Sequence, residues 1–88
     1  MDTLSSLKEL LQKIDKWPTI YMFKFIVPND IGSIARVEAL FAPQAVVYRK
    51  ESKNNKFISI TARQLVHLPE QIVDIYTQAS KIKNIIAL

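Results

Sequence analysis

Residues 19–27 read TIYMFKFIV, a run of β-branched and aromatic residues that Pro28 closes. These residue types favour a β-strand, and proline is typical of a strand boundary. Successive side chains of a strand point to opposite faces. One face therefore carries Tyr21, Phe23, Phe25 and Val27. The other carries Ile20, Met22, Lys24 and Ile26. A strand that is apolar on both faces is usually central in its sheet, and the single lysine indicates that the second face is less buried.

Amphipathic helices are expected before and after this strand. The first, Ser5–Lys16, has leucine and isoleucine at helical spacing and ends at Trp17-Pro18, because a residue before proline avoids the helical region. The second, Ile31–Phe41, follows a turn in which Asn29 or Asp30 can cap the helix. The residues expected to face inward on this second helix are Ile31, Ile34, Ala35, Leu40 and Phe41.

The second half of the chain predicts a hairpin, a helix and a closing strand. The hairpin strands are Ala45–Ser52 and Phe57–Leu65, and the loop between them contains Asn54 and Asn55, which tolerate positive φ. Pro69 suits the first position of a helix. The apolar stripe of that helix comprises Ile72, Val73, Tyr76 and Ala79. The closing strand is Lys83–Leu88.

The element order is a helix followed by β-α-β-β-α-β, which predicts an α+β fold of the ferredoxin-like sandwich type. Right-handed crossovers give the antiparallel sheet the strand order 4-1-3-2 and place both crossover helices on one face. Residues 1–16 would then form an N-terminal helix, and residues 17–88 the ferredoxin-like domain.

Composition excludes several classes of site. The chain has 88 residues, no cysteine and one histidine, so it forms one domain without a disulfide framework, a thiol nucleophile or a cysteine zinc site. His67 has no neighbouring Ser, Cys or Asp that would complete a triad, and the chain has neither a P-loop nor paired carboxylates. We expect no enzyme, no cofactor and no metal; a site built from His67, Glu70 and Asp74 is the weak alternative.

The chain ends and the net charge bear on location and partners. The N-terminus lacks the basic region and apolar core of a signal peptide, and the apolar run Ile20–Val27 is shorter than the ~20 residues of a membrane span. We therefore expect a cytoplasmic protein with no membrane partner. The formal charge of +4 comes mainly from lysine, which favours solubility over phosphate recognition.

Four short segments are similar to those of a known family. The aromatic strand follows the segment Trp17-Pro18-Thr19. The second hairpin strand contains Phe57-Ile58-Ser59-Ile60-Thr61, and the next helix begins with Pro69-Glu70-Gln71-Ile72. The chain ends with the apolar segment Lys83–Leu88. Over about residues 15–88 the chain thus resembles the YbeD-like family of small bacterial proteins of unknown function. The resemblance implies an ACT-like ferredoxin fold, the architecture of many small-molecule regulatory domains, and it carries over no active residue.

A second likeness concerns Val27–Ile34, which is similar to the loop between the first strand and first helix of ACT domains. That loop has a Pro-Gly step and binds an amino acid through backbone groups, whereas here the proline lies four positions before Gly32. The likeness implies a ligand site at Asn29, Asp30 and Gly32, where a helix N-terminus favours anions. The other interpretation is that Asp30 and Gly32 only shape the start of the helix.

The less buried face of the sheet is the candidate interaction surface. The first strand contributes Ile20, Met22, Lys24 and Ile26. The third contributes Phe57, Ser59, Thr61 and Arg63. Arg49 of the second strand is included, although the sequence pattern does not fix its facing. A large apolar patch marks an interface, so either the N-terminal helix or another subunit or protein covers it. Alternatively, Lys24, Arg49 and Arg63 hold an anion.

We therefore expect a small non-enzymatic regulatory or interaction domain. It would sense a small metabolite or bind a partner protein or a second copy through the less buried sheet face. The alternative is binding of single-stranded RNA, because the ferredoxin-like fold hosts the RNA recognition motif. The segment Lys56-Phe57-Ile58-Ser59-Ile60 lacks the glycine and the aromatic pair of that motif, so nucleic acid is the less favoured partner.

Overall fold

The computed structural model describes residues 6–7, 9–10 and 16–88. The elements are β1 (Thr19–Pro28), α2 (Ile31–Glu38), β2 (Val46–Glu51), β3 (Phe57–Val66), α3 (Pro69–Ala79) and β4 (Ile86–Ala87). This order confirms the predicted β-α-β-β-α-β sequence of elements. Residues 6–7 and 9–10 have helical backbone, and the rest of the helix expected over Ser5–Lys16 lies outside the described residues, apart from Lys16, which is not helical.

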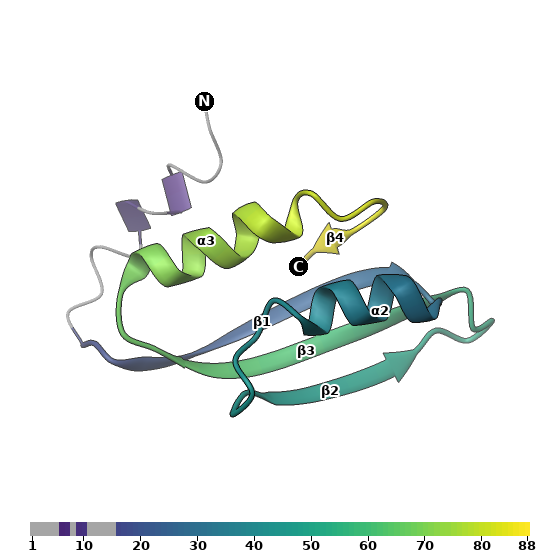
Figure 1. Ribbon diagram of the computed structural model, residues 1–88, viewed down its shortest axis with the longest axis horizontal. Helices are drawn as coiled ribbons and strands as arrows, with labels where there is room; N and C mark the ends of the chain where they lie inside the picture. The colour runs from purple at the N-terminus through teal and green to yellow at the C-terminus, as the bar shows by residue number, and fades with distance from the viewer. Residues whose placement is uncertain (1–5, 8, 11–15) are drawn as a thin grey trace.

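The strands form one antiparallel sheet in the order β2-β3-β1-β4, which is the predicted order. Strand β1 pairs with β3 along its whole length, from Thr19 opposite Val66 to Pro28 opposite Phe57. Strand β4 is far shorter than the expected Lys83–Leu88: Ile86 and Ala87 pair with β1, and the Leu88 backbone N–H donates a 2.9 Å hydrogen bond to the Lys24 carbonyl. Both helices lie on the same side of the sheet, so the molecule has a helical layer and a sheet layer (Figure 1).

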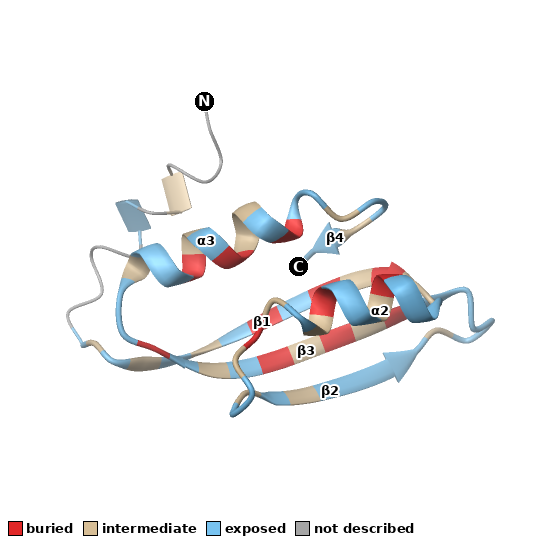
Figure 2. Ribbon diagram, in the orientation of Figure 1, coloured by how far each residue is buried: buried red, intermediate tan, exposed pale blue. Residues whose placement is uncertain are grey.

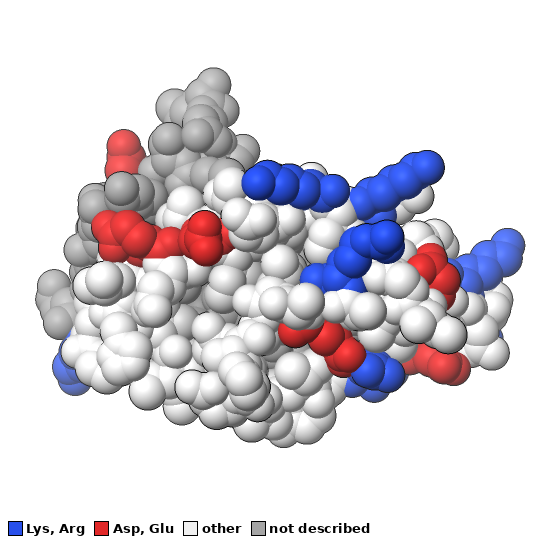
Figure 3. All heavy atoms as spheres, viewed as in Figure 1, with Lys and Arg blue, Asp and Glu red and all other residues white. Residues whose placement is uncertain are grey.

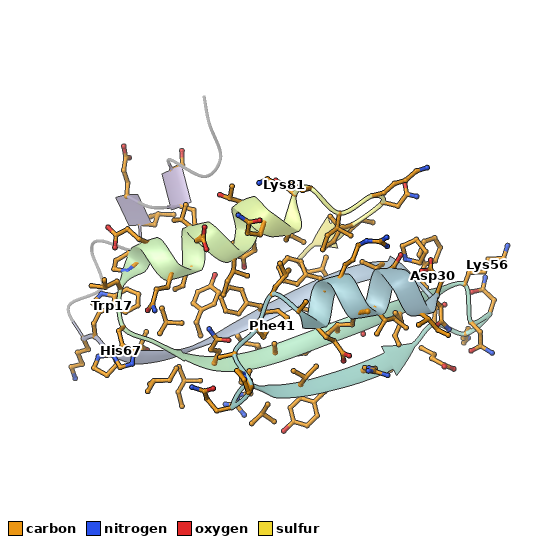
Figure 4. The ribbon with its side chains drawn as sticks, viewed as in Figure 1. Trp17, Asp30, Phe41, Lys56, His67 and Lys81 are labelled. Carbon is orange, nitrogen blue, oxygen red and sulfur yellow. The ribbon has the colours of Figure 1, made fainter. Side chains whose placement is uncertain are left out.

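The core lies between these two layers, as the buried bands on the strands and helices show (Figure 2). Phe23, Phe25 and Val27 are fully buried, which confirms the predicted core face of β1. The ring of Phe23 lies 5.5 Å from that of Phe41 and 5.6 Å from that of Tyr76, so aromatic contacts join α3 and the end of the α2 segment to the sheet. Figure 4 places Phe41 between the layers.

Helix α2 confirms the predicted start, and Ile34, Leu40 and Phe41 pack in or against the core as expected, whereas Ile31 and Ala35, also expected inward, are exposed. Asp30 is the N-cap, and its carboxylate accepts hydrogen bonds from the Ser33 backbone N–H at 2.7 Å and the Ser33 hydroxyl at 3.0 Å. These bonds turn Ser33 and Val37 toward the sheet, four residues apart on one helix face. Ile31 is consequently 89% exposed. The helix also ends at Glu38 rather than Phe41.

Helix α3 begins at Pro69 as predicted. The side chain of Gln71 reaches back to accept hydrogen bonds from the backbone N–H groups of His67 and Leu68, which satisfies donors that precede the helix. Ile72 and Ala79 are buried as expected. Ile75, which the predicted stripe omitted, is also buried, while Val73 and Tyr76 pack at the margin of the core.

Candidate functional site

The candidate site is the side of the sheet turned away from α2 and α3, which we call the open face. Strand pairing fixes its membership, because Phe23, Phe25, Ile60 and Ala62 are buried on the opposite side. The open face comprises Ile20, Met22, Lys24 and Ile26 of β1, Val46, Tyr48 and Lys50 of β2, Phe57, Ser59, Thr61, Arg63 and Leu65 of β3, and Ile86 of β4.

Cross-strand pairing arranges these side chains in rows. Arg63 lies between Val46 and Met22 in one row. Thr61 lies between Tyr48 and Lys24 in the next. In a third row, Lys50, Ser59, Ile26 and Ile86 follow one another across all the strands. Directly paired side chains on one face of a sheet are close enough to interact, so each cation lies beside neutral neighbours within its row.

Large apolar side chains on the open face are widely exposed. Ile20 is 65% exposed, Met22 61% and Tyr48 56%. Half of the other exposed large hydrophobic side chains in the described part of the chain lie here too: Val46, Phe57, Leu65 and Ile86. Scattered apolar side chains are normal on a protein surface, whereas a contiguous group of this kind marks a binding surface.

Two hollows lie at opposite ends of the open face. The first, of about 410 Å³, is lined by Ile26, Lys50, Glu51, Ser52, Phe57, Ser59 and Ile86. The second, of about 450 Å³, is lined by Ile20, Gln44, Val46, Tyr48, Arg63 and Leu65. Each hollow has a mainly apolar lining; the first also has Lys50 and Glu51 at its edge, and the second has Arg63. Both are wide open to solvent, which suits side chains of a docked partner better than an enclosed metabolite.

The charges on the open face have one sign. The strand positions that point to this side carry Lys24, Lys50 and Arg63 and no Asp or Glu. Glu51 occupies a position that alternates to the helical side, although it lines one end of the first hollow. The helical side of the molecule, in contrast, carries charges of both signs (Figure 3). Acidic side chains lie over the start of α3, and basic side chains lie near its end.

Arg49 does not belong to the open face, which corrects its inclusion among the candidate site residues. It lies on the helical side of β2, where its Nε donates a 2.8 Å hydrogen bond to a carboxylate oxygen of Glu38 in α2. Arg49 and Glu38 form a salt bridge, the one found among the residues that the structure describes. The Arg49 guanidinium lowers the pKa of the Glu38 carboxyl by hydrogen bonding and charge, against a smaller opposing effect of burial. Lys24 and Arg63 remain on the open face together with Met22 and Phe57.

The candidate ligand residues of the first loop are engaged within the protein. Asn29 donates a 3.1 Å hydrogen bond from its side-chain amide to the Asn55 carbonyl, and Asp30 caps α2. The backbone and side chain of Ser33 lower the pKa of the Asp30 carboxyl by hydrogen bonding. This anionic cap already occupies the helix N-terminus, and Figure 4 places it at the end of the molecule near Lys56. Gly32 does not have a positive φ. The geometry fits the interpretation that these residues shape the helix start.

The described N-terminal residues lie on the helical side, not over the open face. Leu7 packs against the core cluster between the layers, and Leu10 is 62% exposed. The short N-terminal segments are drawn beside α3 (Figure 1). Of the two alternatives for covering the open face, the N-terminal helix is therefore not supported by Leu7 and Leu10, while Leu11 and Ile14 of the same expected helix lie outside the described part of the chain.

Other candidate chemistry lies elsewhere. His67 is exposed at the same end of the molecule as Trp17, which packs against the core cluster (Figure 4). No group of three or more His, Asp or Glu side chains in the described residues is arranged to hold a metal ion. Among these residues there is also no helix with the length and apolar character needed to cross a membrane.

Several open-face residues were missed by the sequence reasoning. Val46, Tyr48 and Lys50 alternate along β2, but both faces of this edge strand carry polar and apolar residues, so periodicity alone does not fix its facing. Once β3 is placed, its pairing with β2 assigns them. Leu65 continues the alternation of Ser59, Thr61 and Arg63, and this signal was available in the sequence.

Comparison with known proteins places the chain in a family. No curated protein and no solved structure matches it. A family model described as "Protein of unknown function (DUF493)" matches residues 12–88, which include every strand and helix from β1 to β4. The YbeD-like resemblance is consistent with this match. The chain belongs to the DUF493 family of proteins of unknown function.

Proposed function

We propose that the protein is a non-enzymatic interaction domain that binds a partner protein through the open face. The observation that carries the proposal is the exposure of a contiguous apolar surface over the central strands, with Ile20 and Met22 both more than half exposed. Burying an apolar surface stabilises a complex by roughly 25 cal/mol per Å² before the costs of association. Leu7, among the described N-terminal residues, packs against the core on the other side of the sheet and so does not cover this surface.

The chemistry of the open face supports binding over catalysis. Its side chains are aliphatic, aromatic, hydroxyl and cationic, and its strand positions carry no carboxylate or imidazole that would serve as a general base. Two open hollows with apolar linings suit anchoring side chains of a protein. In this proposal the fold is a ferredoxin-like, ACT-like sandwich. The domain acts in the cytoplasm as a regulatory or adaptor module.

Site-specific photocrosslinking tests the proposal. A photoreactive phenylalanine analogue is placed at Met22 or Tyr48 on the open face, and at Gln78 on the exposed side of α3 as the control. We expect protein adducts at the first two positions and not at Gln78 after irradiation of cells that produce the protein. Equal adduct yields at all positions, or adducts that ribonuclease removes, would contradict binding of a protein by this face.

A further inference from the structure

We infer that the partner segment is an acidic amphipathic helix rather than a second copy of this chain. The inference rests on the proposed function and adds the chemistry of the occupant. Lys24, Lys50 and Arg63 lie on the open face, and the strand positions that share this face carry no carboxylate. Within the described residues, the salt bridge is made by Arg49 on the other side of the sheet, so these cations have no internal carboxylate partner.

Self-association through this face is disfavoured by the same charges. In a two-fold symmetric dimer the same patch meets itself. Pairing two open faces would therefore bring Lys24, Lys50 and Arg63 of one copy against the same cations of the other, with no carboxylate from facing strand positions to neutralise them. Like charges that are brought together in an interface oppose association, whereas a negatively charged partner is attracted and steered to the surface.

The spacing of the hollows favours a helix as the occupant. Ile20 lines one hollow and Ile26 lines the other, and both belong to β1. At a rise of roughly 3.3 Å per residue, these two positions are separated by about 20 Å along the strand. A helix of about 13 residues spans that distance, and it presents apolar anchors on one face while its flanks carry acidic residues. Such anchors fit the two apolar hollows, and carboxylates between them reach Lys24, Lys50 and Arg63.

RNA fits this surface less well than an acidic helix. Base stacking needs aromatic side chains along the path of the strand. The central strand β1 contributes Ile20, Met22 and Ile26 to the open face, and the aromatic side chains Tyr48 and Phe57 lie on other strands, two rows apart. The cations are two lysines and one arginine, which provide few phosphate contacts.

A displayed peptide library tests the inference. Peptides of about 16 residues, long enough to span both hollows as helices, carry random apolar, acidic and basic residues and are selected against the full chain. Only those that lose binding to Met22→Glu are analysed further. We expect these peptides to have apolar residues at helical spacing and a net negative charge. Their affinity should fall by about tenfold or more in Lys24→Glu/Arg63→Glu.

The matched control is Lys81→Glu/Lys83→Glu, which changes the net charge equally at exposed positions between α3 and β4. This control should leave peptide affinity unchanged. Open-face-dependent peptides that are neutral or basic, an equal loss in the control, or tighter binding of single-stranded RNA would overturn the acidic-helix inference. A Met22 crosslink to a second copy would overturn it while supporting a protein-binding face. Failure to select any open-face-dependent peptide also counts against it, and the crosslinking result then decides the proposed function separately.

Discussion

The two faces of β1 have similar sequences and opposite environments. Phe23 and Phe25 are fully buried, while Ile20 and Met22, on the same strand, are 65% and 61% exposed. The backbone and its pairing with β3 are common to both faces, so the difference comes from what covers each one. Helices α2 and α3 cover one face, and no described residue covers the other to the same extent. Apolar character therefore stabilises the fold on one face and is available for binding on the other.

Truncation of one residue from each face should give the largest contrast. Phe25→Ala removes a fully buried ring and should lower the free energy of unfolding by about 3–5 kcal/mol. Met22→Ala should change it by less than about 0.5 kcal/mol, because the side chain is mostly exposed. Urea denaturation followed by Trp17 fluorescence measures both. Where Phe25→Ala does not fold, Ile60→Val, with an expected loss of about 1 kcal/mol, replaces it. Comparable losses from Met22→Ala would mean that the open face is covered.

Two tyrosines extend the same contrast to polar groups. The Tyr76 hydroxyl lies 3.3 Å from that of Tyr21 beside the core, whereas Tyr48 is exposed on the open face. Tyr76→Phe should lower the free energy of unfolding by up to about 1 kcal/mol, since the hydrogen bond is only partly buried. Tyr48→Phe should leave it unchanged. Equal effects in thermal unfolding would contradict the assignment of the two residues to different environments.

Burial, and to a smaller extent the Tyr21 hydroxyl, raise the pKa of Tyr76 above its ordinary value near 10. The folded state therefore favours the neutral phenol. Its contribution to stability is fully present below the unfolded pKa and is lost as the pH rises through the folded pKa. In an absorbance titration at alkaline pH, Tyr76 should ionise above the ordinary tyrosine range, and Tyr76→Phe should remove that step.

The cap of α2 should show a pH-dependent effect of intermediate size. Hydrogen bonds from Ser33 lower the pKa of Asp30, so the ionised carboxylate stabilises the folded state above the unfolded pKa. That contribution is lost as the pH falls through the lower folded pKa. Asp30→Ala should therefore lower the melting temperature at pH 7, and the gap to the natural protein should narrow in acid. Asp30→Asn, which keeps a capping oxygen, should have the smaller effect at pH 7. A gap that widens in acid would contradict the capping role.

The smallest stability effects are expected for two arginines on opposite sides of the sheet. Arg49 pairs with Glu38 at the surface, and exposed ion pairs contribute little to stability. Arg63 lies on the open face. Neither Arg49→Gln nor Arg63→Gln should change denaturation beyond experimental error. Only Arg63→Gln should weaken binding of the selected acidic peptides, measured by fluorescence anisotropy. Equal weakening by both variants would show that the peptides do not distinguish the two sides.

Strand periodicity predicted the fold and the open face because β1 and β3 carry strong alternating patterns. Residues 19–27 and 57–65 place Phe25 and Ile60 inward and Lys24 and Arg63 outward, as observed. Strand β2 could not be assigned in the same way, since its charged end has Arg49 and Lys50 on opposite faces. Pairing with β3 settles these orientations, and pairing is a property of the assembled sheet.

The rotation of helix α2 could not be predicted from hydrophobic spacing. Hydrophobicity favoured Ile31 as an inward residue, but the hydrogen bonds between Asp30 and Ser33 set the rotation of the helix and leave Ile31 at the exposed start. Ser33 can be buried because its hydroxyl and its backbone N–H both donate hydrogen bonds to the Asp30 carboxylate. The spacing of hydrophobic residues does not reveal these capping hydrogen bonds. The spacing of Asp30 and Ser33, an aspartate followed three residues later by a serine, does indicate them.

Solvent accessibility of methyl groups tests the central contrast most directly. In the full chain, at micromolar concentration and without a partner, NMR relaxation by a soluble paramagnetic agent reports how close each methyl group lies to solvent. The methyl groups of Met22 and Ile20 should be strongly relaxed, while those of Ile60 and Ile72 should be protected. Protection of Met22 and Ile20 equal to that of Ile60 would contradict an exposed open face.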